Sequence, residues 1–223
     1  MDNLNLFPLL LSFQVAVAST ITCVILGIPI AFLLSVKEGK FIDLIDSLTN
    51  LPIVLPPTVT GYYLLVALGR QSIIGRFLES NFDIMIVFTT TGAVIAASVV
   101  AIPYMIKSAK VAFLQINKDF INSGRLLGRS EVNIFFTIIV PLSWRGIIAG
   151  VSLSFVRALG DFGATLMISG SIPNKTLTMP VAIYNSLQSG DEKTTAMLVT
   201  IMTSLSVVVL FVVNRLEKRL NKG

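Results

Sequence analysis

The charged residues best suited to chemistry lie inside apolar sequence, in the segment RALGDFGAT at residues 157–165. A charge in apolar surroundings is costly, so it usually faces a cavity, a partner or a substrate. Arg157 and Asp161 are four residues apart, so they either neutralise each other along one helix face or leave Arg157 to offset the charge of a passing anion. Gly160 and Gly163 lower helix stability and allow close backbone approach, which suits a hinge or a narrow gate. The candidate gate residues are Arg157, Gly160, Asp161, Gly163 and Thr165.

A proline-rich stretch, LPIVLPPTVTGYY, begins at Leu51. Each proline removes a backbone donor and disfavours helix just before it. Inside a membrane such a break is tolerated only where protein or water satisfies the freed carbonyls. Proline is also common in an ordinary first helical turn, so both interpretations stay open. The candidate pathway residues of this stretch are Pro56, Pro57 and Thr58.

The composition excludes several classes of protein. Of the 223 residues, 54% are apolar and only 13% are charged, which identifies an integral membrane protein. Lysines and arginines lie between apolar runs and not on one soluble face, so we expect no nucleic-acid partner. The chain has no histidine, one cysteine (Cys23) and no dense carboxylate cluster, which leaves little for a metal site or a membrane enzyme. It also lacks the G-x-x-x-x-G-K-[ST] phosphate motif of an ATPase.

We expect one all-α membrane domain over residues 1–223, with about five transmembrane helices. The apolar run at 134–170 is too long for one span and too short for two. We therefore place residues 134–142 at the cytoplasmic interface, with the helix stopped by Pro141, and begin the fourth span at Trp144. The first run is expected to be a retained span, because residues 1–5 include no lysine or arginine. The expected spans are 9–36, 51–69, 84–106, 144–167 and 195–214, with a cytoplasmic coupling loop at 107–142.

Lysine and arginine set the expected orientation, with the amino end outside and the carboxyl end in the cytoplasm. This arrangement gives twelve basic residues in cytoplasmic segments and four outside, with Arg157 inside the membrane. Small residues at four-residue spacing also mark two spans, where they allow close helix packing within the chain or contact across a subunit interface. They are Gly146, Gly150, Ser154 and Ala158 on the fourth span, and Gly92, Ala93, Ala96 and Ala97 on the third.

A polar segment, INSGRLLGRSEVNIFFTIIVP at residues 121–141, interrupts the apolar sequence. Its composition alone is equally typical of a solvated connector. Its spacing resembles the cytoplasmic signature of importer-type ABC transporter permeases: Glu-Ala-Ala, three residues, Gly, nine residues, Ile, one residue, Leu, Pro. In this chain Asn122, Ser123 and Gly124 stand at the Glu-Ala-Ala positions, so the glutamate is absent, and Val140 replaces the leucine. By this resemblance the ATPase-coupling residues are Asn122, Ser123, Gly124, Arg125, Leu127, Gly128, Ile138 and Pro141.

The resemblance extends along nearly the whole chain. The stretches that begin at Leu51 and Arg157 look like those of permease subunits of the molybdate importer type. This implies a coupling helix between spans 3 and 4 that transmits ATP hydrolysis by a separate ATPase subunit to oxyanion translocation. The implied partners are two ATPase copies, a second permease copy, an extracytoplasmic substrate-binding protein and the lipid of the cytoplasmic membrane. ATP and Mg would be used by the ATPase, and we expect no cofactor or metal on this chain.

Several alternatives stay open at this stage. Tungstate and sulfate or thiosulfate share the charge and tetrahedral shape of molybdate, so an importer for one of these anions is the nearest alternative. A secondary anion carrier, which would work without ATP, is an alternative from another class. Such carriers often contain an internal repeat, which this sequence does not show.

Overall fold

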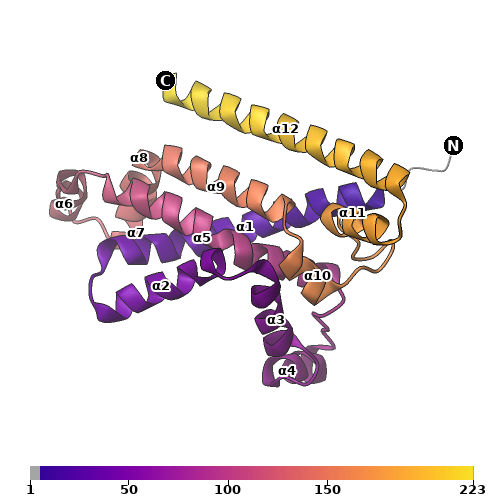
Figure 1. Cartoon of the computed structure of the whole chain (residues 1–223). Coiled ribbons are helices and arrows are strands. Elements are labelled where there is room, and N and C mark those ends of the chain that lie inside the picture. Colours follow the sequence, from indigo (N-terminus) through magenta and orange to yellow (C-terminus); the bar gives the residue numbers. More distant parts are fainter. Residues whose placement is uncertain (1–5, 223) are drawn as a thin grey trace.

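A computed structural model describes residues 6–222, and within that range all regular structure is helical, as expected for an all-α membrane protein. Figure 1 shows the helices in chain order. The elements are α1 (Phe7–Val36), α2 (Lys40–Val54), α3 (Pro57–Leu68), α4 (Ile73–Phe82), α5 (Thr90–Leu114), α6 (Lys118–Leu126), α7 (Glu131–Ile134), the π-helical turn η1 (Phe135–Ile139), α8 (Val140–Leu142), α9 (Trp144–Leu159), α10 (Gly163–Ser169), α11 (Met179–Gln188) and α12 (Glu192–Lys222).

The core is formed by α1, α5 and α9, which run side by side (Figure 1). Alanines fill the space between α1 and α5, where Ala16, Ala93 and Ala97 are fully buried. Small side chains let the two backbones approach, and the hydroxyl of Ser19 donates to the carbonyl of Val94 at 3.0 Å. The small residues predicted to mark the third span therefore serve packing within the chain.

The small residues of α9 lie against α5. A methyl group on Gly150 would lie 3.1 Å from Cβ of Ser108, and the Ser154 hydroxyl donates to the Ala101 carbonyl at 3.4 Å. A methyl group on Gly146 would lie even closer to Cβ of Ala112. Of the two interpretations of this row, packing within the chain is the one that these contacts support.

Up to five membrane spans are present by length and composition. Three helices, α1, α5 and the part of α12 over Glu192–Val213, are long and apolar enough alone. Two more candidates are bent pairs: α2 with α3, at 117°, and Glu131–Leu142 with α9, at 76°. The number agrees with the five spans expected from the sequence, provided that each bent pair counts as one span.

Two predicted spans have different helix boundaries. The prediction of a helix over 51–69 joins the end of α2 to α3, because Pro56 and Pro57 lack the N–H groups that would continue the first helix. The prediction of 84–106 begins too early, since α5 starts at Thr90, where the Thr89 hydroxyl accepts from the Gly92 amide at 3.1 Å. The same helix runs on to Leu114, into the predicted coupling loop.

The predicted fourth span, 144–167, is also divided. Its helix begins at Trp144 as expected, directly after the break at Ser143, but it ends at Leu159. Three residues without helical structure follow, and the short helix α10 then begins at Gly163. The division has a local cause, because the Asp161 side chain accepts from the Thr165 amide and so stabilises a new helix start.

The two ends of the described chain lie at opposite ends of the bundle. In Figure 1, α1 begins beside α11, whereas α12 runs back along the bundle and ends near α8. An odd number of crossings produces this arrangement, and it fits the five expected spans. Two short helices, α4 and α11, lie between the predicted spans, and α4 was not predicted.

Candidate functional site

Asp161 is the centre of the gate segment. Its side chain is almost fully buried in the junction between α9 and α10, where the residue is 3% exposed. One carboxylate oxygen, Oδ2, accepts from the Thr165 amide at 2.9 Å and from the Thr165 hydroxyl at 2.7 Å. Buried carboxylates need such partners, because an unpaired charge in a low-dielectric interior is strongly unfavourable. Asp161 therefore has a structural partner other than Arg157.

Arg157 makes a much looser contact with the same carboxylate. Its Nη1 lies 3.4 Å from Oδ1 of Asp161, and the arginine side chain is 24% exposed. A guanidinium has five N–H donors, and among the described residues this is its one hydrogen bond. The two residues are neighbours, as the four-residue spacing predicted, but the pair leaves most donors of Arg157 available to another group.

Gly163 joins this junction to the proline-rich break. A methyl group there would lie 3.0 Å from the Thr58 amide nitrogen and 3.2 Å from Cβ of Pro57. Glycine is needed because the first turn of α3 rests on α10 at this point. Gly160, by contrast, has φ −91°, and the nearest atom to a methyl group would be 3.7 Å away. Of the two glycines assigned to a hinge or gate, only Gly163 makes a close approach.

A second glycine in this contact was missed by sequence reasoning. Gly61, one turn further along α3, is buried, and a methyl group on it would lie 2.8 Å from Cα of Ala164. Next to it the Thr60 hydroxyl is buried without a hydrogen-bond partner among the described residues. The sequence signal was the Thr-Gly pair within an otherwise bulky apolar helix, a usual sign of close helix packing.

The structure therefore brings most of the predicted pathway residues into one cluster. Arg157, Asp161 and Thr165 meet through side chains, while Gly163 contacts Pro57 and Thr58. Pro56 lies at the break itself, and Gly160 lies on the exposed side of the junction. The predicted coupling residues form a separate group at the far end of α9, around α6 and α7 (Figure 1).

The coupling segment is a tight helix-turn-helix. Gly124 on α6 is buried, and a methyl group there would lie 3.0 Å from Cδ1 of Ile138 and 3.1 Å from Cγ1 of Ile134. Gly128 forms the turn with φ +74°, a left-handed conformation that favours glycine. The helix continues one residue past Pro141 and breaks at Ser143. Gly124, Gly128 and Ile138 thus act together to hold α6 against η1.

An ion pair and a hydrogen bond stabilise the exposed surface of this segment. Arg125 donates to both carboxylate oxygens of Glu131, at 2.7 and 3.0 Å, and this hydrogen bonding holds the pKa of Glu131 below its ordinary value. Arg129 donates to the Thr137 hydroxyl at 3.1 Å. Asn122, Ser123 and Pro141 are exposed.

Two leucines next to the turn are strongly exposed, Leu126 at 89% and Leu127 at 76%. Leu127 was among the predicted coupling residues, whereas Leu126 was missed. Exposed leucines on a polar helix-turn-helix are unusual for a solvated connector and typical of a surface that a partner covers.

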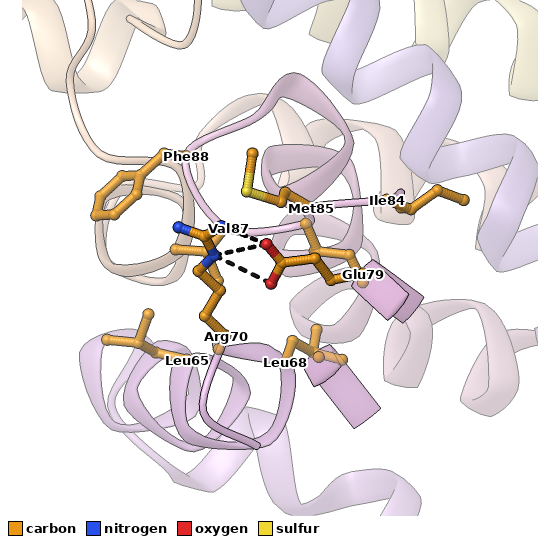
Figure 2. A pocket seen from close by; sticks show the side chains of 11 residues that line it. Leu65, Leu68, Arg70, Glu79, Ile84, Met85, Val87 and Phe88 are labelled. Atoms are coloured by element: carbon orange, nitrogen blue, oxygen red, sulfur yellow. Dashed lines mark hydrogen bonds and ion pairs between the residues drawn. The ribbon is translucent and has the colours of Figure 1, made fainter. Parts of the chain in front are cut away.

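A cavity of about 360 Å³ lies away from both groups, between α3, α4 and residues 84–88 (Figure 2). Its walls are mainly apolar, and its two charges pair with each other, since Arg70 Nε donates to both oxygens of Glu79 at 2.8 and 3.0 Å. This pairing lowers the pKa of Glu79. The cavity therefore offers no free cation for an anion. No cluster of three or more metal-ligating side chains occurs in the part of the chain that the structure describes.

The described chain is thus a helical membrane bundle with broken spans, a polar cluster at one break and a helix-turn-helix at one end. The MetNI methionine ABC transporter, solved in inward-facing conformations, has this fold: the match covers 95% of this chain and 94% of that one, with TM-score 0.72 and 14% identity. The chain belongs to the family described as the binding-protein-dependent transport system inner membrane component, which matches residues 24–222. It is therefore a multi-pass protein of the cytoplasmic membrane.

Two relatives are similar along nearly their whole length. The molybdenum transport system permease protein ModB of Haemophilus influenzae is 39% identical over 213 residues, covering 95% of this chain and 93% of the relative. The putative molybdenum transport system permease protein YvgM of Bacillus subtilis is 39% identical over 208 residues, covering 93% and 92%.

Proposed function

We propose that the chain is the membrane-spanning permease subunit of an ATP-driven importer for molybdate. One observation carries the proposal: relatives from Haemophilus influenzae, Bacillus subtilis and Escherichia coli, each named a molybdenum transport permease, are 39% identical to this chain over at least nine tenths of it. The family assignment supports import that depends on a binding protein.

The proposed assembly contains two copies of this permease, two copies of a separate ATPase subunit and an extracytoplasmic substrate-binding protein. ATP and Mg are used by the ATPase, since the chain contains no G-x-x-x-x-G-K-[ST] motif. The amino end lies outside and the carboxyl end in the cytoplasm. The distribution of lysine and arginine supports this orientation. The two ends of the described chain lie at opposite ends of the bundle in Figure 1, as either orientation with five spans requires.

The ATPase docks on the coupling segment. Support comes from its shape, in which Gly124 and Gly128 permit a compact turn, and from the exposed Leu126 and Leu127 beside that turn. Burying two leucines against a partner would contribute about 1.5–3 kcal/mol each. The glutamate of the family signature is absent, so the contact depends on these apolar side chains and on the turn itself.

The oxyanion passes close to Arg157. Support comes from the geometry of its neighbour: Asp161 is held by Thr165, and the guanidinium contributes one hydrogen bond of 3.4 Å to it. Most of the N–H donors of Arg157 are thus free for a tetrahedral dianion, a group that a guanidinium binds well. Thr58 lies on the same cluster and is exposed, whereas Thr165 is buried and acts only through its hydrogen bonds to Asp161.

The test is uptake of labelled molybdate into vesicles that contain this chain together with its ATPase. The binding protein is added to the assay medium. We expect uptake that requires ATP, stops with vanadate and is competed by tungstate more strongly than by sulfate. Vesicles with the chain alone serve as the control. Vanadate-insensitive uptake by the chain alone would instead identify a secondary anion carrier and overturn the proposal.

A further inference from the structure

The junction between α9 and α10 contains hydrogen bonds of Asp161 that the proposed anion pathway does not require. Asp161 is bonded on both sides of the break: its amide donates to the Ala158 carbonyl of α9 at 3.3 Å, and its carboxylate accepts two hydrogen bonds from Thr165 of α10. A charged acceptor makes such bonds stronger than neutral ones. A break of three residues would otherwise be a flexible joint, and these bonds stiffen it.

The next contact in the series joins α10 to α3. Gly163 rests against Thr58, and Ala164 and Met167 rest against Gly61, all at separations that leave no room for a methyl group. Interlocked backbones of this kind move together, because sliding one past the other would produce steric overlap. The helices α3 and α10 therefore form one packed unit.

The connection of α3 to α2, the helix before it, is weaker than its contact with α10. Pro56 and Pro57 have no N–H groups, the last α2 bond runs from Leu55 to Leu51, and the first α3 bonds run from Val59 and Thr60 to Pro56. In the described part of the chain no backbone hydrogen bond crosses from α2 to α3. With a bend of 117° at this point, α3 is held by α10 more firmly than by α2.

We propose that Asp161 is a positioning residue that fastens α10 to α9, so that α9, α10 and α3 shift as one linkage when the pathway opens. The role of this linkage in transport rests on the proposed function. The linkage itself is inferred from the contacts alone. Since α9 begins next to the coupling segment, the linkage connects that segment, through α10, to the proline-rich break before α3.

The experiment uses the assembled transporter and removes a single hydrogen bond. Thr165→Val deletes the hydroxyl donor to Asp161 and keeps the shape of the side chain. We expect a fall of the order of tenfold in molybdate moved per ATP hydrolysed, because one charge-assisted hydrogen bond is lost. Thr165→Ser, which keeps the hydroxyl, should restore the ratio.

The matched control is Thr20→Val on α1. Thr20 is buried, and its hydroxyl donates to the Ala16 carbonyl at 2.7 Å, so the same atoms are exchanged outside the linkage. A purely structural role of Thr165 would lower the amount of assembled transporter and leave the ratio unchanged. A ratio for Thr165→Val equal to that for Thr20→Val, or a Thr165→Ser ratio as low as that of Thr165→Val, would overturn the proposal.

A second measurement follows α3 directly and does not depend on the identity of the anion. Tyr63→Cys, on the exposed side of α3, is placed in a Cys23→Ala background, and its reaction rate with a thiol reagent is compared with and without trapping of the ATPase by ATP and vanadate. We expect the rate to change with Thr165 present and to stay constant with Thr165→Val. An unchanged rate in the parent protein, or the same change in the variant, would contradict the linkage. A transporter that shows the rate change but takes up no molybdate would contradict only the proposed substrate.

Discussion

Gly61 and Gly160 are single residues of the same type with opposite surroundings. Gly61 is enclosed by α10, whereas a methyl group on Gly160 meets nothing closer than 3.7 Å, in a backbone conformation that alanine adopts. We expect Gly61→Ala to lower the free energy of unfolding by about 1–3 kcal/mol, because the tightly packed contact must open. Gly160→Ala should leave it nearly unchanged. Thermal unfolding in detergent measures both, and equal stabilities would contradict the packing of α3 on α10.

Arg157 can be separated from its neighbour by a double substitution. Asn in place of Asp161 still accepts from Thr165, so Arg157→Met with Asp161→Asn removes both charges and keeps the start of α10. If Arg157 contacts the anion, the double variant should insert and bind the ATPase but transport roughly tenfold more slowly than Asp161→Asn alone, equivalent to about 1.4 kcal/mol. Uptake equal to that of Asp161→Asn at equal expression would leave Arg157 as a structural partner of Asp161 alone.

At the scale of single residues, the sequence identified the residues of the cluster better than it predicted their hydrogen-bond partners. The charges at 157 and 161 stood out because they are rare in apolar sequence, and the structure places them in contact. That Asp161 is held by Thr165 could not be foreseen, because a four-residue spacing fits a continuous helix equally well. Only because the helix breaks after Leu159 does this carboxylate lie before α10 and accept from the first turn of that helix.

Gly128 tests the coupling element. It has φ +74° with no atom within 4 Å of an added methyl group, and Gly190, at the opposite end of the molecule, has φ +75° in equally open surroundings. A substitution to Trp therefore causes the same backbone strain, about 1–2 kcal/mol, at both positions. We expect Gly128→Trp to insert normally but to lose co-purification of the ATPase, while Gly190→Trp keeps it. Retention of the ATPase by Gly128→Trp would remove the docking role of the turn.

Helices were predicted well where their ends carry a chemical signal. The start of α9 at Trp144, predicted from the preceding Pro141, agrees with the structure. Pro56 and Pro57 signalled a break before α3, but the predicted span over 51–69 still crossed it. Signals were weak where apolar sequence continues through a break, so α10 was merged with the fourth span. The helix α4 was missed because a short amphipathic helix of ten residues has too few turns for its period to stand out.

The whole molecule presents an apolar exterior. On α1 the exposed side chains Leu10, Val17 and Ile25 are entirely hydrocarbon, and the most apolar part of α12 has no buried residue. In water such a surface would cause aggregation, whereas in a bilayer it needs no other cover than lipid or a second copy. We therefore infer that the bundle axis lies along the membrane normal, with α6 and α11 on opposite sides of the membrane.

The side of the membrane on which each end of the bundle lies can be tested by thiol labelling. Lys175, between α10 and α11, and Lys118, at the start of α6, are both exposed. The helices α11 and α6 lie at opposite ends of the bundle (Figure 1). The natural Cys23 is fully buried and contributes little background. Because basic residues favour the cytoplasmic side, the α6 end should be inside. An impermeant thiol reagent added to intact cells should therefore label Lys175→Cys at once and Lys118→Cys only after permeabilisation. Labelling in the reverse order would invert the orientation and move the coupling segment away from any cytoplasmic ATPase.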